Sequence, residues 1–357
     1  MKILHLYTQL NIVCGISKTI YQVATNPDEN IQHVVYCHGG DAISKFKNAN
    51  LDLRIAWFSS RGITNKCKSF VEIIRIIKRD KINILHSHHR YFDLLAYFIS
   101  LFYNVKTVTS VHSKVFGKKL ISYKSNSLIA CSKSIKEHLI RYFRIAPHKI
   151  TVIYNFVDME EFNHNDEQYA LRENMNIEEN CIVLGFVGRF SIREKGIDIL
   201  LEAFRLISLN TKNVLLVFIG KGEGEEFIKE FVKKYKLNVM ILAPKDNIYL
   251  FMHLMDIIVL PSRVEPFGIV SIEAGFLKKA FIGSNVGGLC EIIDNSQNGI
   301  LFDSGDFGSL AKSIMTLIND PKLREKYGET LFNKVNDNFT SKKIIPLYTN
   351  LYHSLLR

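Results

Sequence analysis

Short apolar runs alternate with amphipathic segments along the first half of the chain. In segments such as 69–80 and 132–143, apolar residues recur at helical spacing, which predicts helices between the apolar runs. This alternation predicts a parallel sheet with helices on both faces. The predicted strands are Ile3–Tyr7, His33–Cys37, Leu53–Phe58, Ile82–His86, Thr107–His112, Ser127–Cys131 and Ile150–Tyr154.

The second half repeats the pattern after a polar stretch from Glu160 to Glu179, which predicts a linker. We therefore expect two α/β domains, 1–165 and 166–337, each with a Rossmann-like parallel sheet. The segment 338–357 contains an amphipathic helix. The elements predicted in the second domain are strands at 182–187, 214–219, 239–242, 256–260, 281–284 and 300–302, and helices at 197–208 and 225–235.

A strand, a tight loop and a helix are predicted within Val259–Gly275. Pro261 ends the strand, because proline lacks the amide that a central strand donates. A helical pattern begins at Ile269, directly after Gly268. The first amides of that helix, at Ile269 and Val270, lack helical partners and form a favourable site for an anion.

Two glutamates bracket this helix start. Glu265 lies in the loop, and a carboxylate there can serve simply as a partner of the helix dipole. Glu273 lies among Ile272, Ala274 and Gly275, which are packing residues. A glutamate in such surroundings needs a ligand or a partner.

Two cations follow the first predicted strand of the second domain. Arg189 comes directly after Gly188, and Lys195 precedes a predicted helix that starts at Gly196. Cations beside a strand end and a helix start can neutralise the charge that grows on a departing diphosphate. The alternative is that both are ordinary solvated surface residues.

Taken together, these motifs resemble the donor site of GT-B glycosyltransferases, specifically the retaining enzymes of family 4. The resemblance implies two Rossmann-like domains that face each other across a cleft, with the C-terminal helix packed back on the first domain. It assigns Glu273 to the ribose hydroxyls, Arg189 and Lys195 to the diphosphate, and Glu265 to the donor sugar. Gly188 and the backbone at Gly268, Ile269 and Val270 complete the donor contacts.

Two residues of the first domain enter through the same resemblance. His112 ends a predicted parallel strand, where side chains meet ligands, and in related enzymes the matching histidine touches the donor sugar or accommodates charge. The alternative is a hydrogen-bonded structural histidine. Related enzymes usually carry two glycines after the first strand, whereas this chain has Cys14 followed by Gly15, so Gly15 alone is assigned to the donor.

Metal binding is not expected. His86 and His88 can share one face of a strand end, yet no carboxylate or cysteine lies at a ligand spacing from them. The resemblance also implies no essential metal and no cofactor, because cationic side chains take the metal's role.

The positive charge is concentrated in the first half of the chain. Residues 1–165 hold 23 Lys and Arg against 11 Asp and Glu, whereas residues 166–357 hold 23 against 24. Such asymmetry indicates an anionic partner for the first half, and a membrane surface is favoured over nucleic acid because no aromatic–basic interleaving is present. The candidate contacts are 91–103, which can equally be a core helix, and 118–124.

Six cysteines without a CxxC pair, and an N-terminus without a signal-peptide pattern, predict a cytoplasmic chain that can be peripheral on the inner face of the membrane. We expect a retaining transfer of sugar from a nucleotide-sugar, with UDP favoured, to a glycan or glycolipid in bacterial envelope polysaccharide or lipopolysaccharide assembly. The alternatives are a nucleotide-sugar 2-epimerase on the same fold and a non-catalytic protein that binds an anionic ligand.

Overall fold

A computed structural model describes residues 1–357 except 13, 26–27, 29, 60–61, 159–166 and 246. The chain forms two compact units, one built from Met1–Asn155 with Ser341–Arg357 and the other from Phe156–Thr340. The division falls after Asn155, whereas the sequence analysis placed it after 165. The first part of the expected polar linker lies outside the described residues.

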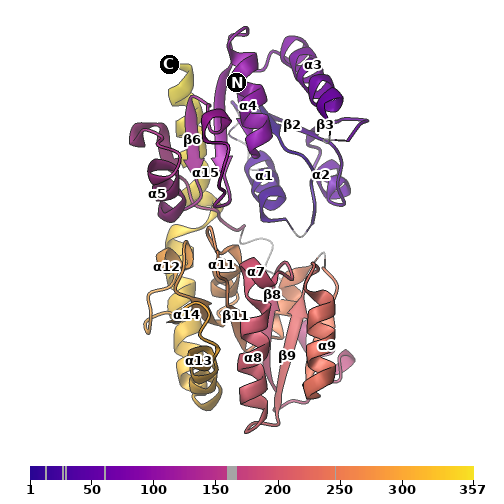
Figure 1. Ribbon diagram of the computed structural model, residues 1–357, viewed down its shortest axis with the longest axis vertical. Helices are drawn as coiled ribbons and strands as arrows, with labels where there is room; N and C mark the ends of the chain where they lie inside the picture. The colour runs from indigo at the N-terminus through magenta and orange to yellow at the C-terminus, as the bar shows by residue number, and fades with distance from the viewer. Residues whose placement is uncertain (13, 26–27, 29, 60–61, 159–166, 246) are drawn as a thin grey trace. The chain divides into compact units, whose positions relative to one another are not determined.

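The first unit contains a seven-stranded, wholly parallel sheet with the order β3-β2-β1-β4-β5-β6-β7. Figure 1 draws the part of this unit before residue 156 in indigo to magenta. Its strands are β1 (Lys2–Leu6), β2 (Gln32–Cys37), β3 (Asp52–Ile55), β4 (Ile84–Ser87), β5 (Lys106–Val111), β6 (Ser127–Ala130) and β7 (Ile150–Val152). The polarity follows from the sequence, because an amphipathic segment between successive strands returns the chain to the same edge of the sheet.

Helices cover both faces of this sheet. On one face, Leu4 and Leu6 of β1 pack with apolar side chains of α3 and α4, while on the other face Val35 and Cys37 of β2 pack with those of α1 and α2. The alternation of neighbouring strand residues between the two faces produces these two cores. The helices are α1 (Gly15–Thr25), α2 (Ile43–Asn48), α3 (Ile63–Asp80), α4 (Arg90–Ser100), α5 (Lys133–Arg141) and α15 (Ser341–Leu356).

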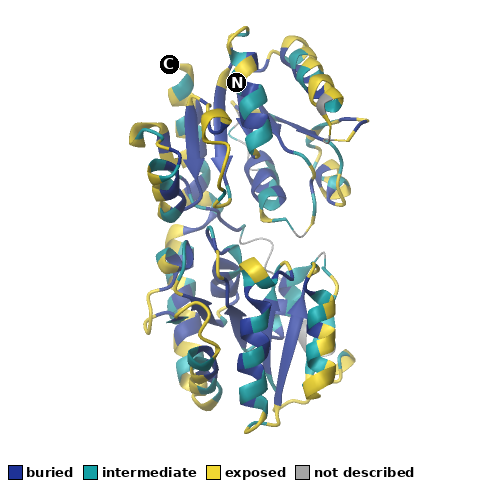
Figure 2. Cartoon of the chain, viewed as in Figure 1, coloured by how far each residue is buried: buried dark blue, intermediate teal, exposed yellow. Residues whose placement is uncertain are grey.

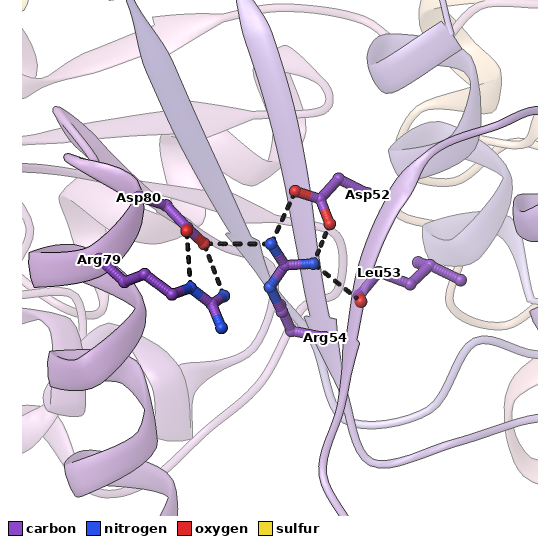
Figure 3. Close-up of polar contacts among 5 residues, drawn as sticks. All are labelled: Asp52, Leu53, Arg54, Arg79 and Asp80. Carbon is purple, nitrogen blue, oxygen red and sulfur yellow. Dashed lines mark hydrogen bonds and ion pairs between the residues drawn. The ribbon is translucent and has the colours of Figure 1, made fainter.

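The edge strand β3 is tied to the end of α3 by charged side chains (Figure 3). Arg54 of β3 pairs with Asp52 and also with Asp80, 3.2 Å away, and Arg79 donates to Asp80 at 2.7 Å. The hydrogen bond from Arg79, together with the charge of Arg54, lowers the pKa of Asp80 to about 2. Charged side chains on an edge strand also discourage pairing with another chain.

The C-terminal helix α15 belongs to the first unit. Ile344, Tyr348 and Tyr352 are its buried side chains, and the hydroxyl of Tyr352 lies 2.8 Å from Nδ1 of His86 in β4. A chain segment more than 200 residues away in sequence thus covers the sheet face that carries His86. The resemblance implied this packing.

The second unit has a six-stranded parallel sheet with the order β10-β9-β8-β11-β12-β13. Its strands are β8 (Ile182–Val187), β9 (Val214–Ile219), β10 (Val239–Leu242), β11 (Ile257–Leu260), β12 (Ala280–Ser284) and β13 (Ile300–Phe302). Its helices are α6 (Glu167–Asn174), α7 (Ile192–Lys195), α8 (Ile197–Ser208), α9 (Glu225–Tyr235), α10 (Ile248–His253), α11 (Ile269–Phe276), α12 (Leu289–Ile292), α13 (Phe307–Asn319) and α14 (Pro321–Asn338).

Burial follows this layering in each unit. Strands are predominantly buried, and the helices expose their outer sides (Figure 2). None of the helices in the described part of the chain combines the length and apolar character that a membrane span requires. Two parallel α/β sheets with covering helices confirm the predicted fold class. The helix α6 was not predicted, because it lies within the polar stretch that was interpreted as linker.

Candidate functional site

The loop between β11 and α11 holds Glu265 in a buried position. Its side chain is 7% exposed, and its Oε2 accepts hydrogen bonds from Lys195 Nζ at 2.6 Å and from Ser262 Oγ at 3.0 Å. A buried carboxylate with a cationic partner and a hydroxyl donor has its charge compensated. The structure therefore joins two of the predicted site residues, Glu265 and Lys195, in one ion pair.

Glycines shape the backbone on both sides of this carboxylate. Gly268 has a backbone φ of +99°, a value that residues with a side chain rarely adopt. A Cβ at this position would lie 2.5 Å from the side chain of Leu289. The carbonyl of Glu265 accepts the amide of Gly288 at 3.0 Å, and a Cβ on Gly287 would lie 2.0 Å from that carbonyl oxygen. The Gly287-Gly288 turn thus holds the Glu265 loop through close backbone contact.

The start of α11 lies beside Glu265. Gly268 occupies the N-cap, and no side chain caps this helix among the described residues. The amides of the first turn, at the half-buried Ile269 and Val270, are those that the sequence analysis assigned to an anion. The uncapped helix start therefore presents backbone amide donors beside the Lys195–Glu265 pair.

Arg189 takes a different partner from Lys195. Its guanidinium pairs with Glu194 of α7, and both side chains are about half exposed. Gly188, which precedes it, lies directly after β8 and has φ +152°. Arg189 and Lys195 therefore both lie in the segment that joins β8 to the start of α8, and each pairs with a different carboxylate.

The loop before Glu265 is also connected to α7. The guanidinium of Arg263 donates to both carboxylate oxygens of Asp198, at 2.8 and 2.7 Å, and to the carbonyl of Ile192 at 2.6 Å. The amide of Arg263 donates to the carbonyl of Glu194 at 2.8 Å. These bonds fix the Glu265 loop relative to the segment that carries Arg189 and Lys195.

Glu273 lies in the interior of α11 and is 6% exposed. Its Oε1 accepts a hydrogen bond of 3.4 Å from the hydroxyl of Tyr249 in α10. A carboxylate this deeply buried retains acceptor capacity for hydroxyl groups of a ligand. Sequence reasoning did not identify Tyr249 or Ser262. Ser262 could have been found as the hydroxyl three positions before Glu265, whereas Tyr249 belongs to a separate helix.

His112 and Gly15 belong to the first unit. His112 follows β5 directly and is half buried, and its Nε2 lies 3.2 Å from Nδ1 of His88. Burial lowers the pKa of His112 to about 4, so the ring is neutral at pH 7 and acts as a hydrogen-bonding group rather than a cation. Gly15 is the exposed first residue of α1, and Cys14 before it has its Sγ 3.3 Å from the Tyr7 hydroxyl.

The histidines near the strand ends form a larger group than the sequence indicated. The ligand atoms of His5, His86 and His88 lie within 4.8 Å of one another, and all three side chains are buried. His5 was missed because it lies on β1, and only the pairing of His5 with His86 in register brings it to this place. Strand pairing in the sheet thus places His5 in this cluster, although it lies far from His86 and His88 in sequence.

Family profiles match both units. The profile described as Glycosyl transferases group 1 matches residues 167–333, and the profile described as Glycosyltransferase Family 4 matches residues 13–161. The capsular polysaccharide biosynthesis glycosyltransferase CapM of Staphylococcus aureus is 30% identical over 247 residues, which cover 67% of this chain and 64% of CapM. The chain thus spans less than two thirds of the length of CapM.

Two further similarities extend over more of the chain. The N-acetyl-alpha-D-glucosaminyl L-malate synthase of Bacillus anthracis is 27% identical over 305 residues, or 80% of this chain and 78% of that enzyme. The crystal structure of Anabaena Alr3699/HepE in complex with UDP-glucose superposes with a TM-score of 0.89 at 18% identity, covering 99% of this chain and 100% of that one. At this identity the superposition shows the fold, which is that of GT-B glycosyltransferases.

Proposed function

We infer the function of this chain from its family. The chain belongs to the glycosyltransferases, since its first unit matches the Glycosyltransferase Family 4 profile and its second unit matches the Glycosyl transferases group 1 profile. We propose that it transfers a sugar, with retention of anomeric configuration, from a nucleotide-sugar donor to a glycan or glycolipid acceptor in cell-envelope polysaccharide or lipopolysaccharide assembly. The observation that carries this proposal is the ion pair of the partly exposed Lys195 with the buried Glu265, beside the uncapped start of α11.

The chemistry of the pair suits a departing nucleoside diphosphate. Lys195 and the α11 amides offer positive charge where the diphosphate accumulates negative charge as the glycosidic bond breaks. Arg189 joins them when it exchanges Glu194 for a phosphate oxygen, an exchange that its exposed position permits. Glu265, held by Lys195 and Ser262, then orients the hydroxyls of the donor sugar.

Glu273 serves the ribose in this proposal. Its buried carboxylate accepts hydrogen bonds from the two vicinal hydroxyls of the ribose. These bonds are charge-assisted, and they favour binding of a nucleoside over binding of a free sugar phosphate. UDP is the proposed nucleotide, and the support is that Alr3699/HepE was solved with UDP and with UDP-glucose. No metal or cofactor is proposed, because the side-chain and backbone donors already supply the positive charge.

Retention follows from a front-face reaction in this proposal. The acceptor hydroxyl attacks the anomeric carbon on the face from which the diphosphate departs, and the leaving phosphate oxygen accepts the hydroxyl proton. The bond from the anomeric carbon to phosphate breaks, and the new glycosidic bond forms on the same face. The neutral imidazole of His112 contributes a hydrogen bond to the donor sugar.

The acceptor is proposed to approach the first unit. That unit holds 26 Lys and Arg against 8 Asp and Glu, while the second unit holds 20 against 27. Beside the exposed Lys118 and Lys119, the apolar side chains of Phe116 and Leu120 are 61% and 86% exposed. Cations next to exposed apolar groups suit an anionic lipid surface, so a glycolipid at the inner face of the membrane is the favoured acceptor.

A screen of nucleotide sugars for thermal stabilisation tests the donor assignment. One UDP-sugar should raise the melting temperature more than free UDP does, and free sugars should have no effect. NMR of the product with a glycolipid acceptor would then report the anomeric configuration. Conversion of the donor alone into an epimer would favour the epimerase, and stabilisation without any turnover would favour a binding protein.

A further inference from the structure

Four histidines of the first unit form a continuous row across four neighbouring strands. His33 lies in β2, His5 in β1, His88 directly after β4 and His112 directly after β5. Their ring nitrogens are spaced at 2.9 Å from His33 to His5, 3.0 Å from His5 to His88 and 3.2 Å from His88 to His112. Each of these distances is that of a hydrogen bond.

The atoms involved give the row a direction. His33 contributes Nδ1 and faces His5 Nε2, then His5 Nδ1 faces His88 Nε2, and His88 Nδ1 faces His112 Nε2. Every contact therefore joins the Nδ1 of one ring to the Nε2 of the next. The two central rings, His5 and His88, are at most 3% exposed, while the two end rings are half buried.

Burial keeps these rings neutral. It lowers the pKa of His33 and of His112 to about 4, and it lowers the pKa values of His5 and His88 well below the usual range. Among the described residues, His86 from β4 has ring contacts with His5 and His88, Tyr352 from α15 has one with His33, and Tyr348 from α15 contacts His86. Burial raises the pKa values of both phenols. A neutral imidazole has one N–H and one lone pair.

Only two arrangements of protons satisfy all three hydrogen bonds. Either all four rings carry the proton on Nε2, or all four carry it on Nδ1. Any mixture places two N–H groups or two lone pairs against each other at some contact, which is costly in a buried position. The tautomer of His112 is therefore coupled to that of the buried rings.

We propose that His33, His5, His88 and His112 form a hydrogen-bonded relay that sets which ring nitrogen of His112 carries its proton. His5 and His88 are then positioning residues for His112. With every proton on Nε2, the Nδ1 of His112 is an acceptor, and with every proton on Nδ1, it is a donor. Switching moves three protons across the three contacts, while His33 Nε2 releases one proton and His112 Nδ1 takes up one.

A buried metal ion is the competing use of this cluster, through His5, His86 and His88. The hydrogen bonds favour the relay. Both nitrogens of His86 already have polar partners, Tyr352 at Nδ1 and Ser110 at Nε2, each at 2.8 Å. Nδ1 of His5 and Nε2 of His88 face each other at hydrogen-bond distance. Coordination would break a bond of His86 and the central bond of the row.

Long-range 1H–15N NMR spectra of the full chain with 15N-labelled histidine test the relay, since they distinguish the two tautomers. At pH 7.5 the four rings should share one tautomer. His5→Phe interrupts the row and should shift the ring nitrogens of His112 toward the values of a tautomer mixture. His86→Gln is the matched control, equally buried on the same face but outside the row, and it should leave the tautomer of His112 unchanged.

Different tautomers among the four rings of the wild type would overturn the relay, as would a His112 tautomer that His5→Phe leaves unchanged. The wild-type spectrum decides even if His5→Phe does not fold. Stoichiometric zinc retained on His5, His86 and His88 after purification, measured by elemental analysis, would also overturn it, since the metal would separate His5 from His88.

The consequence for activity rests on the proposed function, in which His112 contacts the donor sugar. Loss of one oriented hydrogen bond should lower kcat of His5→Phe about tenfold at unchanged KM. A tautomer change without a change in kcat would remove the role of His112 in the proposed function and leave the relay intact. The two proposals thus fail through different measurements.

Discussion

Glu273 is a carboxylate in a helix interior where an apolar side chain would be expected. Its Oε1 accepts a 3.4 Å hydrogen bond from the hydroxyl of Tyr249. We expect Glu273→Ala to weaken binding of the nucleotide sugar by about 10- to 150-fold, because charge-assisted bonds to hydroxyls contribute about 1.5–3 kcal/mol. Calorimetric titration measures this change.

Tyr249→Phe is the matched control for Glu273→Ala. It removes the hydroxyl that donates to the same carboxylate, and it leaves the carboxylate in place for the ligand. Its donor affinity should stay within about threefold of the wild type, since the carboxylate that accepts from the ligand hydroxyls is retained and the 3.4 Å bond that is lost is long. Wild-type affinity in Glu273→Ala would contradict the ribose assignment.

Lys195 and Arg189 should act mainly as the diphosphate departs. Lys195→Ala and Arg189→Ala are expected to lower kcat more than they raise KM, because charge develops on the leaving group in the transition state. Arg193→Ala is the control, since Arg193 is an exposed cation of the same short helix. Steady-state kinetics at saturating donor measure the split, and full turnover in both variants would identify them as ordinary surface cations.

Residues close together in sequence were predictable, and residues joined by the fold were not. The loop from Pro261 to Gly268 could be predicted because its proline, glycine and helix start are local signals. The partner of Lys195 could not, because Glu265 lies 70 positions away in sequence whereas Glu194 is adjacent, and yet Glu194 pairs with Arg189. His5 joined the histidine group through strand register alone.

At the level of elements, the turn before α12 determines where the Glu265 loop lies. Alanine at Gly287 adds a Cβ that would lie 2.0 Å from the carbonyl oxygen of Glu265, so the loop must move. A shift of about 1 Å in a positioning loop can cost about 100-fold in rate. We therefore expect Gly287→Ala to lower kcat/KM by at least about tenfold in the transfer assay.

Gly305→Ala separates this displacement from backbone strain. Gly305 also has a positive φ, +96°, but a Cβ there meets no atom within 4 Å. Both variants should lose about 1–2 kcal/mol of stability from the left-handed backbone, yet only Gly287→Ala should lose activity. Equal activity of the two variants would show that the close contact with Glu265 does not position the loop.

Strands were predicted more reliably than the elements around them. The apolar runs of both sheets are distinctive, and each predicted strand corresponds to an observed one. Helix α6 was missed because its sequence, Glu167–Asn174, is polar, and the tertiary context decides whether such a segment forms a helix.

The candidate membrane segment 91–103 has both buried and exposed apolar side chains in the structure. Phe92, Ala96 and Ile99 are core residues, whereas Leu101 and Phe102 are exposed.

At the scale of the whole molecule, the buried histidines make the first unit sensitive to acid. Burial lowers the pKa values of His5, His86 and His88 well below 6.5, and those of His33 and His112 to about 4. The unfolded chain then binds more protons than the native chain as the pH falls below 6.5, so the stability present above 6.5 is lost progressively toward pH 4.

Hydrogen–deuterium exchange on the full chain, corrected for intrinsic rates, separates the two units in one experiment. Strands β1 and β4 should lose protection between pH 6.5 and pH 4, while β8 and β9 should keep theirs longer because none of their residues is a histidine. Parallel loss in both units would contradict the assignment of acid sensitivity to the histidines.

The charge difference between the units predicts binding to anionic vesicles. The first unit has a formal charge of +18 (26 against 8) and the second −7 (20 against 27). Each cation close to an anionic bilayer contributes about 1 kcal/mol, and the attraction decays within about 10 Å at 0.1 M salt. Co-sedimentation with phosphatidylserine vesicles should therefore be strong at low salt and fall steeply as salt is added.

The segment 118–124 is the predicted point of contact, because its exposed lysines lie beside the exposed side chains of Phe116 and Leu120. Reversing Lys118, Lys119 and Lys124 to glutamate should abolish most of the binding. Reversing Lys233, Lys234 and Lys236 at the end of α9 changes the net charge by the same amount on the other unit. If net charge alone governed association, the two triple variants would bind equally weakly. If the first unit carries the contact, only the first variant loses vesicle binding. Absence of wild-type sedimentation at low salt would contradict membrane binding and leave a soluble acceptor.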